Sequence, residues 1–189
     1  PRYPTLAGNN GARHIIQGPW LGPIAAIPDF DPDGQPTPLA DGDDLDGNDD
    51  EDGVTFSPII AGQPMAFTIQ ANNGGGFVDG WIDFNGDGIW QEPGERVIGP
   101  GLIVPGGPYT LSYPVSPNAV AGQTYARFRI NSAGNLGPAG ILPSGQVPDG
   151  EVEDYVLTIL PVETPLDYGD APDPTFPTLL INDGARHFP

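Results

Sequence analysis

The sequence contains no cysteine and no lysine, and its six basic residues are all arginine. The absence of cysteine excludes disulfide bonds, thiolate zinc sites and cysteine nucleophiles, although it does not identify the compartment in which the protein works. The absence of lysine excludes Schiff-base catalysis and cross-links through a lysine amine. Covalent stiffening of these kinds is therefore not available to this chain.

Long apolar segments are also missing. No run approaches the roughly 20 apolar residues that a membrane-spanning helix needs. The chain opens with Pro1-Arg2-Tyr3-Pro4 rather than with a methionine and an apolar leader, so we expect a mature or internal piece of a protein. No 11-residue window has a convincing helical period, and proline interrupts most candidate helices. These absences favour a fold made of strands.

Acidic residues are what the chain has in excess. It carries 25 Asp and Glu against six Arg, which gives a formal net charge of −19 over 189 residues. Such a charge repels phosphate backbones and anionic surfaces, so we expect no nucleic-acid partner and no membrane insertion. Gly (28) and Pro (25) are frequent enough for a low-complexity chain. The apolar residues are nevertheless patterned, which indicates a folded all-β domain.

Alternating apolar and polar residues mark the expected strands. They are 65–72, 77–84, 109–115, 124–131 and 152–160, with shorter candidates at 54–60 and 96–98. Turn dipeptides such as Asn73-Gly74 separate them. This spacing predicts a β-sandwich of about seven to nine short strands. Residues 1–53 are rich in proline and then in acid, and we expect them to wrap the sandwich as an ordered loop, with a free tail as the alternative.

An internal repeat divides the chain. Tyr3-Pro4-Thr5-Leu6 and Gly11-Ala12-Arg13-His14 recur as Phe176-Pro177-Thr178-Leu179 and Gly184-Ala185-Arg186-His187, both at an offset of 173 residues. We therefore expect one repeat at 1–160, followed at 161–189 by a linker and the start of the next repeat. Residues 1–16 are expected to pair with an edge of the sandwich, and residues 177–187 with the next unit. The pattern is compatible both with one continuous chain and with separate subunits that donate a segment.

The first candidate metal site is the segment 83–89, Asp-Phe-Asn-Gly-Asp-Gly-Ile, which has the spacing of the first half of a calcium-binding loop. Side-chain oxygens two residues apart lie on the inside of a tight turn, and the carbonyl of the seventh residue adds a ligand. A complete EF-hand loop would have Glu at the twelfth position, where this chain has Gly94. An Asx-rich turn without an ion is the alternative. The candidate ligands are Asp83, Asn85, Asp87, Ile89, Glu92 and Glu95.

The second candidate is the acidic run 41–53, in which side-chain oxygens again recur at every second position. A solvated acidic loop is the alternative, because most charge runs are solvated. The spacing and the strand that follows at Val54 favour cation binding. The candidate ligands are Asp44, Asp46, Asn48, Asp50 and Asp52.

The third candidate lies in the segment 151–155, Glu-Val-Glu-Asp-Tyr. Strand alternation turns Glu151, Glu153 and Tyr155 to the inward face. A buried carboxylate needs an ion or an arginine to compensate its charge, so Glu151, Glu153 and Asp154 are further candidate ligands.

Two arginines share one strand face. In the segment 124–131, Tyr125, Arg127 and Arg129 alternate with three apolar residues. In a chain this acidic, we expect the two guanidinium groups to form surface ion pairs with carboxylates, each worth about 0–1 kcal/mol.

These motifs together resemble the GEVED domain family, whose signature is spelled by residues 150–155. Other parts of the family pattern are matched at 4–6, 11–14, 42–44, 50–54, 81–85, 126–129 and 167–172, so the resemblance covers essentially the whole chain. It implies a β-sandwich module found in tandem in large secreted or surface proteins of bacteria, without established catalysis. It also implies that the acidic clusters bind calcium, and it assigns no individual ligand.

We therefore expect a non-enzymatic, extracellular structural repeat, secreted or at the cell surface. Its sandwich units would be linked head to tail into a fibre or stalk that calcium stiffens, and its partners would be copies of itself or adjacent repeats. An adhesin or carbohydrate-binding module is the alternative, with glycans stacked on exposed rings of Trp20 or Trp90 and with Trp81 in the core.

The sequence gives less support to a catalytic function than to a structural one. Glu151 and Glu153 resemble the carboxylate pair of a glycosidase, but residues two apart on one strand do not face each other across a cleft. His14 and His187 occupy the same repeat position, so each unit has one histidine, and we expect it to make a structural hydrogen bond.

Overall fold

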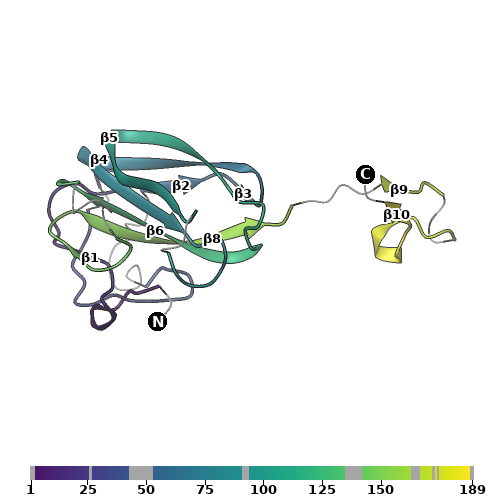
Figure 1. The fold of residues 1–189 in the computed structure, drawn as a ribbon, viewed down its shortest axis with the longest axis horizontal. Coiled ribbons are helices and arrows are strands. Elements are labelled where there is room, and N and C mark those ends of the chain that lie inside the picture. The colour runs from purple at the N-terminus through teal and green to yellow at the C-terminus, as the bar shows by residue number, and fades with distance from the viewer. Residues whose placement is uncertain are drawn as a thin grey trace.

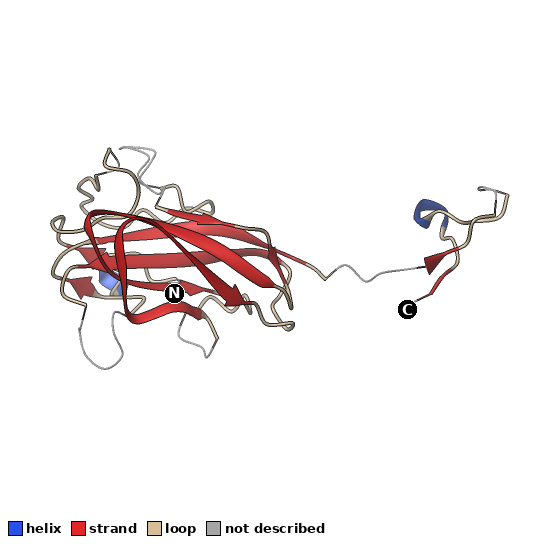
Figure 2. Ribbon diagram, turned by 90° about the horizontal axis from the view of Figure 1, so that it is seen from above, coloured by secondary structure: helices blue, strands red, loops and turns tan. Residues whose placement is uncertain are grey.

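In the computed structural model the chain forms an all-β sandwich, which confirms the predicted fold class (Figures 1 and 2). The structure describes residues 3–25, 27–42, 53–90, 94–134, 142–162, 167–171, 173 and 175–187. Within these ranges, no helix is long and apolar enough to cross a membrane.

Among the described residues, four long strands build the sandwich, and short strands and two 3₁₀ helices surround them. The long strands are β4 (Pro64–Ile82), β5 (Arg96–Pro114), β6 (Gly122–Asn131) and β8 (Glu151–Leu160). The short strands are β1 (Arg13–His14), β2 (Val54–Phe56), β3 (Ile59–Ile60), β7 (Gln146–Val147), β9 (Asp167–Tyr168) and β10 (Arg186–His187). The 3₁₀ helices are η1 (Ala7–Asn9) and η2 (Leu180–Asn182).

The main sheet has the strand order β2-β4-β6-β8-β3, and β5 pairs with β4 along most of its length. Neighbouring strands run antiparallel except β3 and β8, which are parallel. Register shifts between Ala71 and Gly75, and again after Val78, interrupt the pairing of β4 with β5. Irregularities of this kind bend a strand and increase its twist. The first part of β4 pairs with β2 and its second part with β6, so this one strand joins both parts of the sheet.

The expected strands are present, but two pairs of them are joined. The segments 65–72 and 77–84 belong to the single strand β4, and the segments 96–98 and 109–115 both belong to β5. The Asn73-Gly74 dipeptide, expected to make a hairpin turn, instead lies at the register shift of β4. Both residues have positive φ angles, 53° and 86°, which a bulge accommodates without reversing the chain.

Alternation along the strands produces the core. On β6, Ala126, Phe128 and Ile130 are fully buried in the main hydrophobic cluster, as the pattern predicts. A second, smaller cluster of Trp81, Trp90 and Val147 is buried apart from it, with Tyr3 and Tyr125 packed against it. The two clusters lie on opposite faces of β6, because Tyr125 alternates with the residues of the first cluster.

The N-terminal part of the chain wraps the sandwich, as expected, wherever the structure describes it. Leu21 is fully buried and bridges to Ala71 of β4, and the N–H of Gly22 donates to the carbonyl of Gln70 at 2.9 Å. Gln123 and Tyr125 of β6 also donate to the carbonyl of Pro38, at 3.1 and 2.8 Å. These contacts favour an ordered wrap over a free tail in the described part of this segment. The acidic run 43–52 lies outside the described residues.

Residues 3–14, called the head segment below, pair with the sandwich through β1. The partner of β1 is β7, in parallel register with Arg13 opposite Gln146. β7 lies in the connection between β6 and β8, so the segment finds a strand as expected but not at an edge of the main sheet.

Residues 176–187, called the tail segment below, lie beyond the end of β8. Figures 1 and 2 both show this part of the chain away from the sandwich. Its strand β10 pairs with β9 in antiparallel register, with Arg186 opposite Tyr168. The tail segment contains η2 and β10 where the head segment contains η1 and β1, so the repeat in the sequence is also a repeat in structure.

Candidate functional site

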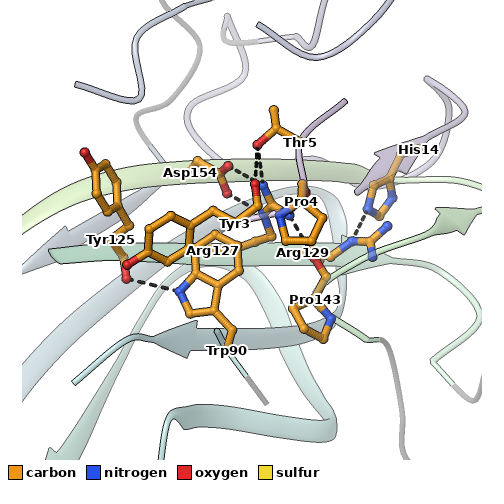
Figure 3. A network of polar contacts seen from close by, with 10 residues as sticks. All are labelled: Tyr3, Pro4, Thr5, His14, Trp90, Tyr125, Arg127, Arg129, Pro143 and Asp154. Carbon is orange, nitrogen blue, oxygen red and sulfur yellow. Dashed lines mark hydrogen bonds and ion pairs between the residues drawn. The ribbon is translucent and has the colours of Figure 1, made fainter. Parts of the chain in front are cut away.

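The head segment covers a face of the sandwich that carries the two arginines of β6, and we call Arg127 and Arg129 the arginine face. Arg127 is 1% exposed, and its Nε and Nη2 donate to the two carboxylate oxygens of Asp154 at 2.6 and 2.5 Å. Its Nη1 donates to the carbonyls of Pro4 and Pro143, at 2.7 and 2.9 Å, as Figure 3 shows. The guanidinium also lies over the ring of Trp90, 4.5 Å from its centroid. Arg127 therefore binds the head segment to the sandwich.

Arg129 is fully buried, and all five of its N–H donors are used. Four bonds go to carbonyl oxygens, those of Leu142, Ser144, Gly145 and Arg13. The fifth runs from Nε to Nε2 of His14 at 2.9 Å. Burial, and after it the neighbouring Arg127, lower the pKa of Arg129 to about 9. The side chain still carries its charge at neutral pH.

His14 is fixed in one tautomer by its two partners. Its Nε2 accepts from Arg129, which can only donate, so Nδ1 carries the proton and donates to the carbonyl of Asp149 at 2.6 Å. Burial, and after it the charge of Arg129, lower the pKa of His14 to about 3. The neutral imidazole is the form that fits this site, and it makes the structural hydrogen bonds expected of it.

The expectation of surface ion pairs on this strand is wrong. Arg127 does pair with Asp154, but the arginine is buried, and Arg129 is held by carbonyls and an imidazole. The reason is the head segment, together with the loop at 142–147, which covers both guanidinium groups and supplies oxygen acceptors. Alternation places the two side chains on one face, but nothing in β6 indicates that another segment covers it.

The loop after β4 brings three acidic residues together. Ligand atoms of Asp83, Asp87 and Glu95 all lie within 4.8 Å of one another. Asp83 and Glu95 are buried, at 0% and 3% exposed, and Asp87 is exposed. In the part of the chain that the structure describes, this is the one such group of three acidic, histidine or cysteine residues. Three of the six residues proposed in and beside this loop therefore converge.

Asp83 organises the turn. Its carboxylate accepts the N–H groups of Gly86 and Gly88, at 2.6 and 2.9 Å. Asn85 and Asp87 bond to one another, and the N–H of Ile89 donates to Asp87 at 2.8 Å. Asn85 and Ile89 thus lie in the same turn as the three acids.

Tyr3 of the head segment reaches the same loop, and sequence reasoning missed this role. Its hydroxyl donates to Oδ2 of Asp83 at 2.5 Å, and its N–H donates to the carbonyl of Gly88 at 3.2 Å. Its ring packs on Trp90 and Tyr125, with centroids 4.6 and 4.9 Å apart. Burial, followed by the hydrogen bond to Asp83, raises the pKa of Tyr3. The available signal was the aromatic residue that opens both copies of the repeated motif.

The inward glutamates of β8 bind the wrap. Glu151 accepts the N–H of Leu21 at 2.5 Å, and Glu153 accepts the N–H of Gly53 at 3.2 Å. The hydroxyl of Tyr155 donates to Glu153 at 2.6 Å and accepts the N–H of Val54, and burial raises the pKa of this tyrosine. Backbone N–H groups thus help to compensate the buried charges of these glutamates, a role that the sequence predicted for an ion or an arginine.

The other proposed ligands do not join the group of three. Glu151, Glu153 and Asp154 are described and lie outside it, and Asp154 is paired with Arg127. Glu92 and the run Asp44, Asp46, Asn48, Asp50 and Asp52 lie outside the described residues.

The tryptophans do not form the exposed platform that sugar stacking needs. Trp81 and Trp90 are both 3% exposed, and the ring of Trp90 is covered by Tyr3 and Arg127. Trp20 is half-buried in the wrap. The core position expected for Trp81 is confirmed, and the exposed position considered for Trp90 is wrong, because the head segment packs over it.

Residues 77–158 match the family model of the GEVED domain, in agreement with the resemblance seen in the sequence. The matched region runs from the second part of β4 into β8, so it includes the arginine face, the loop after β4 and the two inward glutamates. The searches of curated proteins and of solved structures returned no match.

Proposed function

We propose that the chain is a non-enzymatic, extracellular structural repeat whose sandwich units are linked head to tail into a fibre or surface stalk, and that calcium stiffens each unit. The observation that carries the proposal is the recurrence of one segment at both ends of the sandwich. The head segment is seated on the arginine face, and the tail segment repeats its sequence and local fold beyond β8. A sandwich followed by the opening segment of another is the repeating unit of a linear array.

Calcium suits the donors of the loop after β4. Calcium is bound by oxygen ligands at about 2.3–2.6 Å, so ligands on opposite sides of one ion lie about 5 Å apart. Ligand atoms of Asp83, Asp87 and Glu95 lie within 4.8 Å of one another, which is compatible with a single ion of this size. Asn85 and the carbonyl of Ile89, in the same turn, are the further proposed ligands.

An ion at this position would join three parts of the unit. Asp83 directly follows β4, and Glu95 directly precedes β5. Asp83 also accepts the hydroxyl of Tyr3, so the same group of acids contacts the head segment. A divalent cation would offset part of the net charge of −19 and would fix a turn too polar to be held by hydrophobic packing.

A hydrolytic function is not favoured by the contacts of the glutamates. Glu151 and Glu153 lie on one strand, are at most 5% exposed, and bond to backbone N–H groups of the wrap. Their hydrogen bonds support a structural role.

The test is thermal unfolding of the protein in EGTA and in about 2 mM calcium. At a dissociation constant of about 0.2 mM, within the range of extracellular modules, calcium would add about 1.4 kcal/mol. For a domain of this size we expect the Tm to rise by about 3–6 °C. Asp87→Asn, at an exposed ligand, should abolish most of this rise and leave the Tm in EGTA nearly unchanged.

Asp183→Asn is the matched control, because it removes one acid from a position that is 93% exposed in the tail segment. It should keep the full calcium effect. Equal melting curves of the unsubstituted protein with and without calcium would contradict the proposal that calcium stiffens the unit.

A further inference from the structure

The head and tail segments are two copies of one preformed structure. In each, a 3₁₀ turn ends at a residue with left-handed backbone, Asn10 in the head and Asp183 in the tail. The glycine that follows is required in both copies. A Cβ on Gly11 would lie 2.0 Å from the carbonyl oxygen of Thr5, and one on Gly184 would lie 2.2 Å from that of Thr178.

Local hydrogen bonds repeat as well. The hydroxyl of Thr5 donates to the carbonyl of Tyr3 at 3.0 Å. The hydroxyl of Thr178 lies 2.8 Å from the corresponding carbonyl of Phe176 and 2.6 Å from that of Ala171. Arg13 donates to the carbonyl of Gly11, and Arg186 donates to that of Gly184. The tail segment therefore has its docking conformation before it docks, which reduces the entropy lost on binding.

The arginine face recognises groups that both copies carry. In the head segment the bonded atoms are the carbonyl of Pro4, the hydroxyl of Thr5 and the ring of His14 (Figure 3). The carbonyl of Arg13 is the fourth. The residues at these positions in the tail segment are identical, namely Pro177, Arg186, Thr178 and His187.

The copies differ in what covers them. Phe176 is 60% exposed and both residues of β10 are exposed, whereas Tyr3 and both residues of β1 are half-buried. The tail segment thus offers the recognition groups of the head segment, with its apolar first residue exposed. Its strand β10 is exposed as well, although one of its edges pairs with β9.

We propose that the tail segment of one chain docks on the arginine face of a second chain, in place of that chain's own head segment, and so links the two chains head to tail. β10 of the donor then pairs with β7 of the acceptor, with Arg186 opposite Gln146. This proposal rests on the head-to-tail array proposed above and adds which contact joins two units, namely a tail segment on the arginine face of the next unit.

On the arginine face, the donor's tail segment has to compete with the acceptor's own head segment, which is covalently tethered to the same sandwich. A covalently attached head has an effective concentration of order 1 mM, so at about 0.1 mM protein a foreign tail of equal affinity holds of order a tenth of the sites. Phe176 also lacks the hydroxyl with which Tyr3 bonds Asp83, which favours the chain's own head. A covalent trap is therefore needed to accumulate the exchanged form.

The absence of cysteine makes such a trap simple to build. Two variants of the 189-residue chain are mixed in a glutathione redox buffer, the acceptor Gln146→Cys and the donor Arg186→Cys. Both positions are exposed, and paired residues on neighbouring strands lie about 5 Å apart, within the Cα range of a disulfide. Intact mass spectrometry then separates the heterodimer from the two homodimers.

The matched control donor is Ile181→Cys, which is 89% exposed on the same segment but corresponds to Gly8, away from β7 in the docked head. We expect about tenfold more heterodimer with Arg186→Cys than with Ile181→Cys. Tyr3→Ala in the acceptor, by weakening its own head, should raise the heterodimer yield, and Phe176→Ala in the donor should lower it. Circular dichroism checks that the variants are folded.

Equal heterodimer yields with the two donors, unaffected by the changes at Tyr3 and Phe176, would overturn the proposal. The calcium test above is independent of this one. Segment exchange without calcium-dependent melting would support docking of the tail segment and contradict calcium stiffening. Calcium-dependent melting without segment exchange would support calcium stiffening and contradict docking of the tail segment.

Discussion

At the scale of single residues, the unusual group is a buried arginine that is satisfied mainly by carbonyl oxygens. Arg129 loses all contact with solvent and recovers hydrogen bonds from the 142–147 loop, from Arg13 and from the ring of His14. Leaving one of these donors without an acceptor would cost several kcal/mol, because a buried charge is expensive when it is poorly solvated. The imidazole must therefore stay neutral for the head segment to remain docked.

This requirement gives the stability a pH dependence. The pKa of His14 is about 3 in the folded protein and 6.5 ordinarily, so the unfolded chain binds the proton first as the pH falls. The stabilisation is complete above pH 6.5 and is lost progressively as the pH falls toward 3, with about 2 kcal/mol lost between pH 7 and pH 5. Urea unfolding of the protein and of His14→Gln at both pH values measures this contribution.

His187→Gln is the matched control, since it removes the same ring from the exposed position of the tail segment. It should keep the pH dependence of the unsubstituted protein, whereas His14→Gln should lose about 2 kcal/mol of it. A His14→Gln variant with the full dependence would show that the ring does not titrate as its contacts with Arg129 and Asp149 require.

At the scale of elements, the bulge in β4 decides the shape of the sandwich. Asn73, Gly74 and Gly75 all have positive φ angles, and the register between β4 and β5 shifts across them. A Cβ on Gly75 would lie 2.2 Å from the carbonyl oxygen of Val104, while one on Gly74 would meet nothing within 4 Å. The two glycines therefore share a backbone requirement but differ in the space around them.

Alanine at these neighbouring positions separates the two effects. Gly74→Ala should cost about 1–2 kcal/mol, from the left-handed backbone alone. Gly75→Ala should cost at least about 2 kcal/mol more, because β5 has to move away from the new methyl group. Urea unfolding measures both losses of stability. Equal losses would contradict the close approach of the Val104 carbonyl to Gly75.

At the scale of the whole molecule, a net charge of −19 opposes folding. Like charges are closer together in the folded chain than in the unfolded one, so their repulsion favours unfolding. Buried pairs such as Arg127 and Asp154 are screened much less by salt than exposed acids are. Repulsion between exposed acids should therefore dominate the response of stability to monovalent salt.

We expect the Tm in EGTA to rise by about 2–5 °C when NaCl is increased from 20 to 200 mM. KCl should act equally, because screening depends on ionic strength and not on the ion, and Asp87→Asn should keep nearly the whole effect. Differential scanning calorimetry measures the shift. A Tm that stays constant or falls would mean that attractive surface pairs, rather than repulsion, dominate the electrostatics.

Much of the fold follows from local pattern. Alternation gives the strands and the apolar face of β6, because side-chain direction in a strand depends only on neighbouring residues, and the repeated motif marks the head and tail segments. The spacing at 83–89 similarly identifies Asp83 and Asp87 of the convergent group, since a tight turn brings alternate side chains together. Glu95 was included on its proximity in sequence and is brought in by the start of β5.

The partners of buried charges were decided by the tertiary structure alone. Pro4 and Pro143 are far from Arg127 in the sequence, and Leu21 and Gly53 are far from the glutamates of β8 that accept their N–H groups. The sequence by itself determined which side chains share a face of a strand, because successive side chains point to opposite faces. Only the folded chain decided what meets them, because covering segments are placed by contacts between distant residues, and a backbone carbonyl or N–H that compensates a charge leaves no mark in the residue types.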